Sequence, residues 1–273
     1  MLKISIGIAL IALAALFLVF LYLSAPSGKK RNELEAFRGK YFAHRGLHNL
    51  NRGIPENSIT AFKAAVHFGF GIENDIRLTA DGEVVVFHDE TLERACGANV
   101  KVSDLTLEEL REYKLFGTEE KIPTLEECLE TVNGKVPLLI EFKEGDYPAF
   151  RIYRKANEIL SAYNGQYLVQ SFDPRIMREY KIHNPEICRG QLASFYKGKG
   201  LKVFLAGLLL ANYMSRPHFV SYKHIHKNNF FLRFNKFLGA FLICWTLRSD
   251  DELDECWDKF DAYIFEGFLP EDE

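Results

Sequence analysis

Short apolar runs alternate with longer stretches of helical spacing along most of the chain. After residue 38, eight runs of four to six residues are rich in the β-branched and aromatic side chains that favour strands. Between them, apolar residues recur every three to four positions, as they do on one face of a helix. This alternation predicts an α/β fold around a parallel sheet. The predicted strands are Lys40–Ala43, Ile72–Ile76, Leu138–Phe142, Tyr167–Ser171, Ile187–Gln191, His218–Ser221, Ala240–Trp245 and Ala262–Phe265.

The number of strands and the length of this region together favour a barrel. The 235 residues that follow position 38 come close to the ~250 residues of a typical (β/α)8 TIM barrel. Residues 39–273 are therefore predicted to form one such domain. Barrel enzymes carry their chemistry in the loops at the carboxyl ends of the strands, so polar residues at those ends are the candidates for a site.

A ninth strand-like run, Glu83–Phe87, follows the second predicted strand too closely for a parallel crossover, which needs about a dozen residues or more. It is predicted to return as a hairpin arm, through a two-residue turn at residues 81–82 or through a four-residue loop. The first register pairs Asp75 with His88, and the second pairs Glu73 with His88. Because side chains alternate with a period of two, both registers place His88 on the face that carries the two acids.

The amino-terminal segment has a different pattern. No charged residue occurs from Ile4 to Leu23, which matches the ~20 residues that a helix needs to cross a bilayer. Residues 1–24 are predicted to form an uncleaved, single-pass transmembrane helix, and residues 25–38 a juxtamembrane linker. The alternative is a cleaved signal peptide, whose apolar region would be only ~7–15 residues long and whose one candidate cleavage stretch contains Pro26.

Charge and cysteine content narrow the functional classes. The formal net charge of -3 provides no global basic field, so nucleic acid is not an expected partner. The five cysteines are odd in number, scattered and without a CxxC pair; they are interpreted as reduced core residues, which favours the cytoplasmic side. Lys29, Lys30 and Arg31 follow the apolar segment, whereas only Lys3 precedes it, and this difference slightly favours a cytoplasmic body.

Three carboxylates are predicted at strand ends: Glu73 and Asp75 on one face of the second strand, and Glu141 near the end of the third. Oxygen ligands on separate rigid strands suit Mg²⁺ or Ca²⁺. Alternating acids in a strand can also mark a solvated sheet face. The run Glu73-Asn74-Asp75, however, belongs to an otherwise buried strand with no lysine beside it, where unpaired acids would be costly.

Two histidines and two basic residues complete the predicted constellation. His44 and His88 each follow a strand, and imidazoles suit general acid and base catalysis. A single histidine is more often structural, but both accompany Arg45 and Lys143 at strand carboxyl ends. The planar fork of an arginine and the point charge of a lysine complement a phosphate group.

These motifs closely resemble those of the glycerophosphodiester phosphodiesterases. The similarity extends over roughly residues 40–265 and is most specific in its amino-terminal half. The matching segments are His44-Arg45-Gly46, Pro55-Glu56-Asn57-Ser58, Ile72-Glu73-Asn74-Asp75, Thr79-Ala80-Asp81-Gly82, Val85-Val86-Phe87-His88-Asp89, Leu92-Glu93-Arg94, Ile122-Pro123-Thr124-Leu125, Ile140-Glu141-Phe142-Lys143, Gln170-Ser171-Phe172-Asp173 and Trp245-Thr246.

The resemblance implies a phospholipase-C-like phosphodiesterase barrel that hydrolyses glycerophosphodiesters or lysophospholipids to an alcohol and (lyso)glycerol 3-phosphate. By position it makes Glu73, Asp75 and Glu141 ligands of Mg²⁺ or Ca²⁺, with Mn²⁺ also possible. It further assigns acid–base catalysis to His44 and His88, phosphate contacts to Arg45 and Lys143, and a supporting role to Glu56. One departure concerns the last strand, where the family's Thr-Asp-x-Pro motif is replaced by Phe265-Glu266-Gly267-Phe268.

Two alternatives to this function remain open from the sequence. One is a phospholipase-D-like lyase of the same barrel superfamily that releases a cyclic phosphate. The other is a non-catalytic, membrane-tethered lipid-binding barrel. The sequence leaves open the headgroup, the metal, the acid and base roles of the two histidines, the membrane orientation and the oligomeric state. Two apolar stretches, 203–211 and 230–237, are interpreted either as barrel-covering helices or as a membrane-facing lip that admits an acylated substrate.

Overall fold

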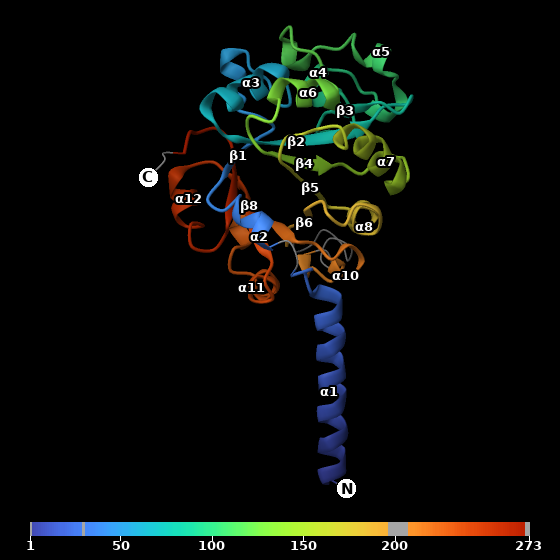
Figure 1. The fold of residues 1–273 in the computed structure, drawn as a ribbon, viewed down its shortest axis with the longest axis vertical. Coiled ribbons are helices and arrows are strands. Elements are labelled where there is room, and N and C mark those ends of the chain that lie inside the picture. The colour runs from blue at the N-terminus through green and yellow to red at the C-terminus, as the bar shows by residue number, and fades with distance from the viewer. Residues whose placement is uncertain (1, 29–30, 196–206, 271–273) are drawn as a thin grey trace.

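The computed structural model describes residues 2–28, 31–195 and 207–270. Eight parallel strands close into a barrel in the order β1-β9-β8-β7-β6-β5-β4-β2, and β1 pairs with β2 to complete the ring. Helices surround the barrel, and a single long helix projects from the body (Figure 1). The predicted TIM barrel is confirmed. The strands are β1 (Tyr41–His44), β2 (Gly71–Leu78), β3 (Val84–Val86), β4 (Leu138–Phe142), β5 (Tyr167–Ser171), β6 (Arg189–Ala193), β7 (Phe219–Lys223), β8 (Phe241–Leu247) and β9 (Ala262–Phe265).

The helices alternate with the strands as the apolar pattern predicted. Three of the eight predicted strands have the observed bounds, and the other five differ by one or two residues at each end. The helices longer than three residues are α1 (Leu2–Ser24), α2 (Arg31–Glu35), α3 (Ile59–Phe68), α4 (Glu93–Cys96), α5 (Leu107–Leu110), α6 (Leu125–Val132), α7 (Ala149–Leu160), α8 (Pro174–His183), α10 (Asn212–Ser215), α11 (Phe230–Phe237) and α12 (Asp250–Asp254).

The hairpin between β2 and β3 has neither of the two predicted registers. Its arms pair Ile76 with Val86, and the backbone N–H of Thr79 donates to the carbonyl of Glu83 at 3.0 Å, which leaves a three-residue loop. The side chains determine this loop length: the Thr79 hydroxyl accepts from the Glu83 N–H at 2.9 Å and donates to Asp81 at 2.5 Å. Gly82 takes a φ of +90°, which favours glycine.

Contrary to the prediction from the sequence, the position of His88 is not set by the hairpin register. It lies beyond the end of β3, where the chain has left the ladder. The guanidinium of Arg77 donates to the His88 carbonyl from Nε at 2.9 Å and from Nη2 at 2.7 Å. This backbone clamp, rather than strand alternation, fixes the position of His88.

The amino-terminal end of the barrel is filled by aromatic rings that lie over glycines on neighbouring strands. Phe42 pairs with Gly71, and Phe219 pairs with Gly190. A Cβ at Gly71 would lie 2.7 Å from the Phe42 ring, and one at Gly190 would lie 2.1 Å from the Phe219 ring. Both phenylalanines are fully buried, so these two glycines allow the barrel interior to be filled.

Part of the segment predicted as a juxtamembrane linker packs against the barrel. Leu34 of α2 and the following Phe37 are buried in the same apolar cluster as Phe42, and the rings of Phe37 and Phe42 stack at 6.4 Å. The segment therefore closes the amino-terminal end of the barrel. Of the two apolar stretches, 230–237 coincides with α11, whereas residues 203–206 of the other lie outside the described residues.

Gly190→Ala should destabilise the barrel by about 1–3 kcal/mol, because the new methyl group overpacks a filled interior. Urea unfolding followed by tryptophan fluorescence measures the change. Combining Gly190→Ala with Phe219→Leu should cost less than the sum of the two single substitutions, since the smaller side chain makes room for the methyl group. Strict additivity would show that the ring of Phe219 is not what excludes a side chain at position 190.

Candidate active site

The strand register brings the predicted site residues together at the carboxyl end of the barrel. His44 of β1 pairs with Glu73 of β2, and Asp75 of β2 pairs with Glu141 of β4. Paired residues of neighbouring strands project from the same face of a sheet, and residues two apart on one strand do so as well. The four side chains therefore project into the barrel, from the three adjacent strands seen in Figure 1.

The three carboxylates form a compact, buried cluster. Oxygen atoms of Glu73, Asp75 and Glu141 all lie within 4.8 Å of one another. Their side chains are almost fully buried. Burial, followed by the charges of Asp75 and Glu141, raises the pKa of Glu73 well above its usual value. Three acids so close together cannot all remain ionised without nearby positive charge.

Two basic side chains supply part of that charge. The ammonium of Lys143 lies 2.9 Å from Asp75 Oδ1 and also forms an ion pair with Glu141. The guanidinium of Arg45 lies 3.3 Å from Asp75 Oδ2 and 2.6 Å from Glu56. Burial alone would raise the pKa of Asp75, but the charges of Lys143, His88 and Arg45 hold it well below its usual value.

The donor set fits a hard divalent cation. Lys143 and Arg45 offset two of the three clustered acids, and Arg45 is shared with Glu56. A residual negative charge is thus left among carboxylate oxygens on two rigid strands, which are the ligands that Mg²⁺ and Ca²⁺ prefer. Glu73, whose ionisation is the most opposed, is the acid that a cation would stabilise most.

Each histidine is oriented by a carboxylate that an arginine holds in turn. The Nδ1 atom of His44 hydrogen-bonds to Glu266, and Nη2 of Arg248 lies 2.5 Å from the same carboxylate. Burial alone would raise the pKa of Glu266, but its contacts with His44 and Arg248 lower it to about 2. A carboxylate on Nδ1 fixes the tautomer of the ring. It leaves Nε2 as the atom of His44 available to a substrate.

The second histidine repeats this arrangement. His88 Nδ1 lies 2.6 Å from Asp89 Oδ1, and Arg94 Nε donates to Asp89 Oδ2 at 2.6 Å. Burial, with the charges of Lys143 and Arg45, lowers the pKa of His88 to about 4, although Asp75 opposes the change. Arg94 also binds Glu56 at 2.6 Å, so the support of His88 is connected to the support of Arg45.

Several supporting residues were not singled out from the sequence. Asn57 is buried and donates to Asp75 Oδ2 at 2.9 Å. Glu266 follows the last strand directly, where the resemblance led us to expect the aspartate of a Thr-Asp-x-Pro motif. The sequence therefore held a signal for Glu266, because this acid stands where the family motif has an aspartate. No local pattern pointed to Arg248, which reaches Glu266 only through the tertiary fold.

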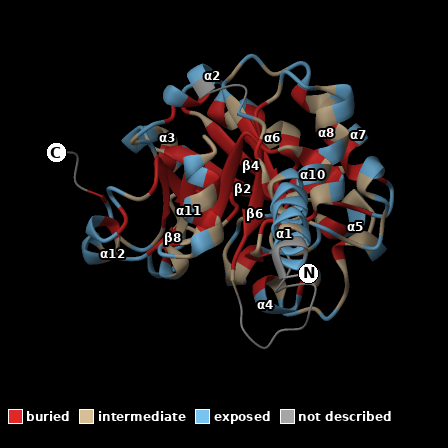
Figure 2. Cartoon of the chain, turned by 90° about the horizontal axis from the view of Figure 1, so that it is seen from below, coloured by how far each residue is buried: buried red, intermediate tan, exposed pale blue. Residues whose placement is uncertain are grey.

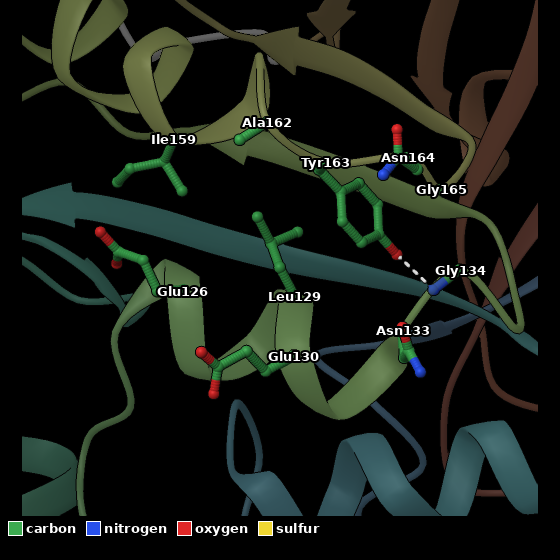
Figure 3. Close-up of a pocket in the computed structure, with 10 residues that line it drawn as sticks. All are labelled: Glu126, Leu129, Glu130, Asn133, Gly134, Ile159, Ala162, Tyr163, Asn164 and Gly165. Carbon is green, nitrogen blue, oxygen red and sulfur yellow. Dashed lines mark hydrogen bonds between the residues drawn. The ribbon is translucent and has the colours of Figure 1, made fainter.

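A separate pocket lies on the outer wall of the barrel, away from this cluster (Figure 3). It has a volume of about 470 Å³ and lies between α6 and the end of α7. Glu126 and Glu130 lie on α6, and the hydroxyl of Tyr163 accepts from the backbone N–H of Gly134 at 3.0 Å. None of the predicted site residues lines it. The candidate active site is therefore the cluster at the carboxyl end of the barrel.

Comparisons with known proteins agree with the fold and identify the family. Residues 44–267 match the glycerophosphoryl diester phosphodiesterase family. A glycerophosphodiester phosphodiesterase of Caldanaerobacter subterraneus is 38% identical over 162 residues, which are 55% of this chain and 65% of that protein. Human lysophospholipase D is 33% identical over 162 residues, which are 55% of this chain and 49% of that protein.

A solved structure supports the same relationship. The glycerophosphodiester phosphodiesterase of Thermotoga maritima superposes with a TM-score of 0.66 at 27% identity, covering 83% of this chain and 94% of that one. The aligned part of this chain spans about half to two thirds of the length of the two sequence relatives. Because the family match extends over most of its residues, the chain belongs to the glycerophosphoryl diester phosphodiesterase family.

Proposed function

We propose that this protein hydrolyses glycerophosphodiesters or lysophospholipids to an alcohol and (lyso)glycerol 3-phosphate, with the help of a divalent cation. The observation that carries the proposal is the convergence of a buried acidic triad with two carboxylate-oriented histidines at one end of the barrel. The names of the relatives support this substrate class. A lysophospholipid substrate also agrees with an apolar helix that would keep the enzyme at a membrane.

Glu73, Asp75 and Glu141 would hold the cation, which when bound would withdraw charge from a phosphoryl oxygen. Lys143 and Arg45 lie against the same acids, where their positive charges would attract the phosphate and orient it for in-line attack. Glu56 supports Arg45 through an ion pair of 2.6 Å. These residues thus bind and orient the diester rather than exchange protons with it.

The two histidines would move the protons. One imidazole accepts the proton of the attacking water or substrate hydroxyl while a new O–P bond forms. The other donates a proton to the leaving alkoxide as the old P–O bond breaks. Glu266 and Asp89 would keep each Nε2 directed at the phosphate. Attack by a substrate hydroxyl instead of water would give the cyclic product of the lyase alternative.

The proposal includes a retained membrane span. Among the described residues, one helix is long and apolar enough to cross a bilayer, Ser5–Ser24. Its carboxyl end is built into the body: Ser24 is fully buried, and its carbonyl accepts from Asn212 Nδ2 at 2.8 Å. Arg216 Nη1 also donates to the carbonyls of Tyr22 at 2.7 Å and Ala25 at 3.0 Å. A cleavage site at residues 24–26 would lie inside this packed junction.

Helix α11 lies beside the end of that span, on the face of the body from which α1 projects (Figures 1 and 2). The ring of Phe20 in α1 lies 5.8 Å from that of Phe231 and 5.3 Å from that of Phe234. The outer face of α11 carries Phe230 and Phe237, which are 66% and 84% exposed. Apolar rings at this exposure would be expensive in water.

The position of Phe20 in α1 gives the depth at which α11 would lie in the proposed membrane. Phe20 is four residues before Ser24, the end of the span, or about 6 Å at the ~1.5 Å rise of a helix. Interfacial helices insert ~5–10 Å into the boundary between headgroups and acyl chains. The phenylalanines of α11 would therefore lie at that boundary. This placement favours the membrane-facing interpretation of residues 230–237.

Glu73→Gln should weaken Mg²⁺ or Ca²⁺ binding by more than the roughly 10–100-fold typical of outer-shell substitutions, and activity should fall with it. The same substitution should raise the thermal stability of the metal-free protein, because it removes one of three repelling acids. Calorimetric titration and thermal unfolding measure the two effects. Glu130→Gln, on α6, is the matched control. Full activity after exhaustive chelation would overturn the proposed metal dependence.

His44→Ala and His88→Ala should each lower kcat by about 10²–10⁴-fold, the typical contribution of general acid–base catalysis. Glu266→Gln should cause a smaller fall in kcat with little change in KM, because the ring remains but loses its charged partner. A diester with a nitrophenol leaving group should partly rescue the variant that lacks the general acid. Rescue of neither histidine variant would contradict the assignment, and phosphorus NMR would distinguish a linear from a cyclic product.

Phe237→Trp in the full chain, reconstituted in vesicles, should be quenched by phosphatidylcholine with brominated acyl chains. Phe68→Trp, the same change at a 55% exposed phenylalanine at the end of α3, should not be quenched. The unsubstituted chain corrects for Trp245 and Trp257. Phe17→Trp in α1 separates the two parts of the proposal: quenching there without quenching at 237 would refute only the seating of α11, and its absence would refute the span.

A further inference from the structure

A cleft separates the carboxyl end of α1 from the amino-terminal end of the barrel, opposite the end that carries the catalytic residues. It has a volume of about 600 Å³. One wall comes from the end of α1 and the chain that follows it, and the other from α8, the start of β6 and the segment that enters β7. Its lining residues include Leu18, Leu21 and Tyr22 on the α1 wall and Lys181, Arg189 and Arg216 on the barrel wall.

The barrel-side wall gathers three basic side chains and no acid. Lys181, Arg189 and Arg216 line the cleft, and none of its lining residues is a carboxylate. Within the described part of the chain, the polar partners of these cations are backbone carbonyls. Lys181 Nζ donates to Met214 at 2.9 Å, and Arg189 Nε donates to Ser215 at 2.7 Å. Among the residues that the structure describes, three like charges thus share one cleft without a countercharge.

Arg189 provides a second, independent indication of a ligand. Arg189 is only 4% exposed. Its Nε and Nη2 atoms are hydrogen-bonded to Ser215 and Arg216, whereas its buried Nη1 has no hydrogen-bond partner among the described residues. A buried guanidinium with an unmet donor is costly. Burial lowers the pKa of Arg189 to about 10, and burial together with the charges of Arg216 and Arg189 lowers that of Lys181.

The opposite wall of the cleft is apolar and belongs to the proposed membrane span. Leu18 and Tyr22 of α1 are both more than half exposed, and both line the cleft. The guanidinium of Arg216 lies 4.8 Å from the centre of the Tyr22 ring, so the basic and apolar walls meet at this residue. A ligand that satisfies both walls must join an anionic group to hydrocarbon.

We propose that this cleft binds the phosphate headgroup of an anionic phospholipid, with the acyl chains lying along Leu18 and Leu21 of α1. The proposal rests on the proposed membrane span, which places the cleft at the level of the headgroups. The phosphate accepts hydrogen bonds from Lys181 and from Nη1 of Arg189, which supplies the missing countercharge. The bound lipid joins anchor and barrel at the end opposite catalysis, so it is a structural ligand and not the substrate.

The test uses the full chain in neutral detergent micelles and a short-chain phosphatidylglycerol with a fluorescent acyl chain, with binding followed by anisotropy. The lipid should bind more tightly than the matching phosphatidylcholine. Lys181→Gln should weaken its binding about fivefold, the effect of one basic residue near a lipid surface, and Lys181→Arg should restore it. Arg178→Gln, which removes an exposed charge from the same helix α8 outside the cleft, should have a clearly smaller effect.

Hydrolysis of water-soluble glycerophosphocholine, measured on the same preparations, separates this site from the proposed activity. Lys181→Gln should leave that turnover unchanged. If the unsubstituted chain does not hydrolyse glycerophosphocholine, the proposed function is refuted instead. Equal binding of the two lipids, or equal effects of Lys181→Gln and Arg178→Gln, would overturn the lipid site. Competition by glycerol phosphate as strong as that by the lipid would assign the cleft to a free phosphate and would overturn the proposal as well.

Discussion

The mutual repulsion of three buried carboxylates is the constraint on which the rest of the site depends. Oxygen atoms of Glu73, Asp75 and Glu141 lie within 4.8 Å of one another, because the register of β2 against β4 puts all three side chains on one face of the sheet. Lys143 and Arg45 make this arrangement tolerable, and they leave enough residual charge to favour a divalent cation. The repulsion among the three acids thus occurs at the point where the proposed reaction would bind a metal ion and a phosphate group.

The two ends of the barrel are built from different residues and have different proposed roles. Acids, with two histidines, gather at the carboxyl ends of the strands, whereas the amino-terminal end is filled by aromatic rings and bordered by Lys181, Arg189 and Arg216. The apolar helix joins the body at this second end. A lipid bound at the amino-terminal end, as proposed, would leave the loops at the carboxyl end open to substrate, because the two sites lie at opposite ends of the barrel.

Hydrogen bonds from neighbouring acids and arginines orient the two histidines of the site. Each histidine is oriented through Nδ1 by an acid, and each acid is held by an arginine. One of these acids, Glu266, stands where the resemblance led us to expect an aspartate. The longer glutamate side chain reaches Nδ1 of His44 from this position.

The sequence by itself determined the alternation of strands and helices, the barrel, the apolar amino-terminal helix and the polar residues at the strand ends. These features depend on local periodicity and residue chemistry, which a chain displays before it folds. The tertiary structure decided the rest. The three-residue hairpin loop depends on side-chain bonds of Thr79 and Asp81 that no propensity describes. Arg248 pairs with Glu266, and Arg216 donates to the carbonyl of Tyr22 in the apolar helix, only because the tertiary fold brings these distant segments together.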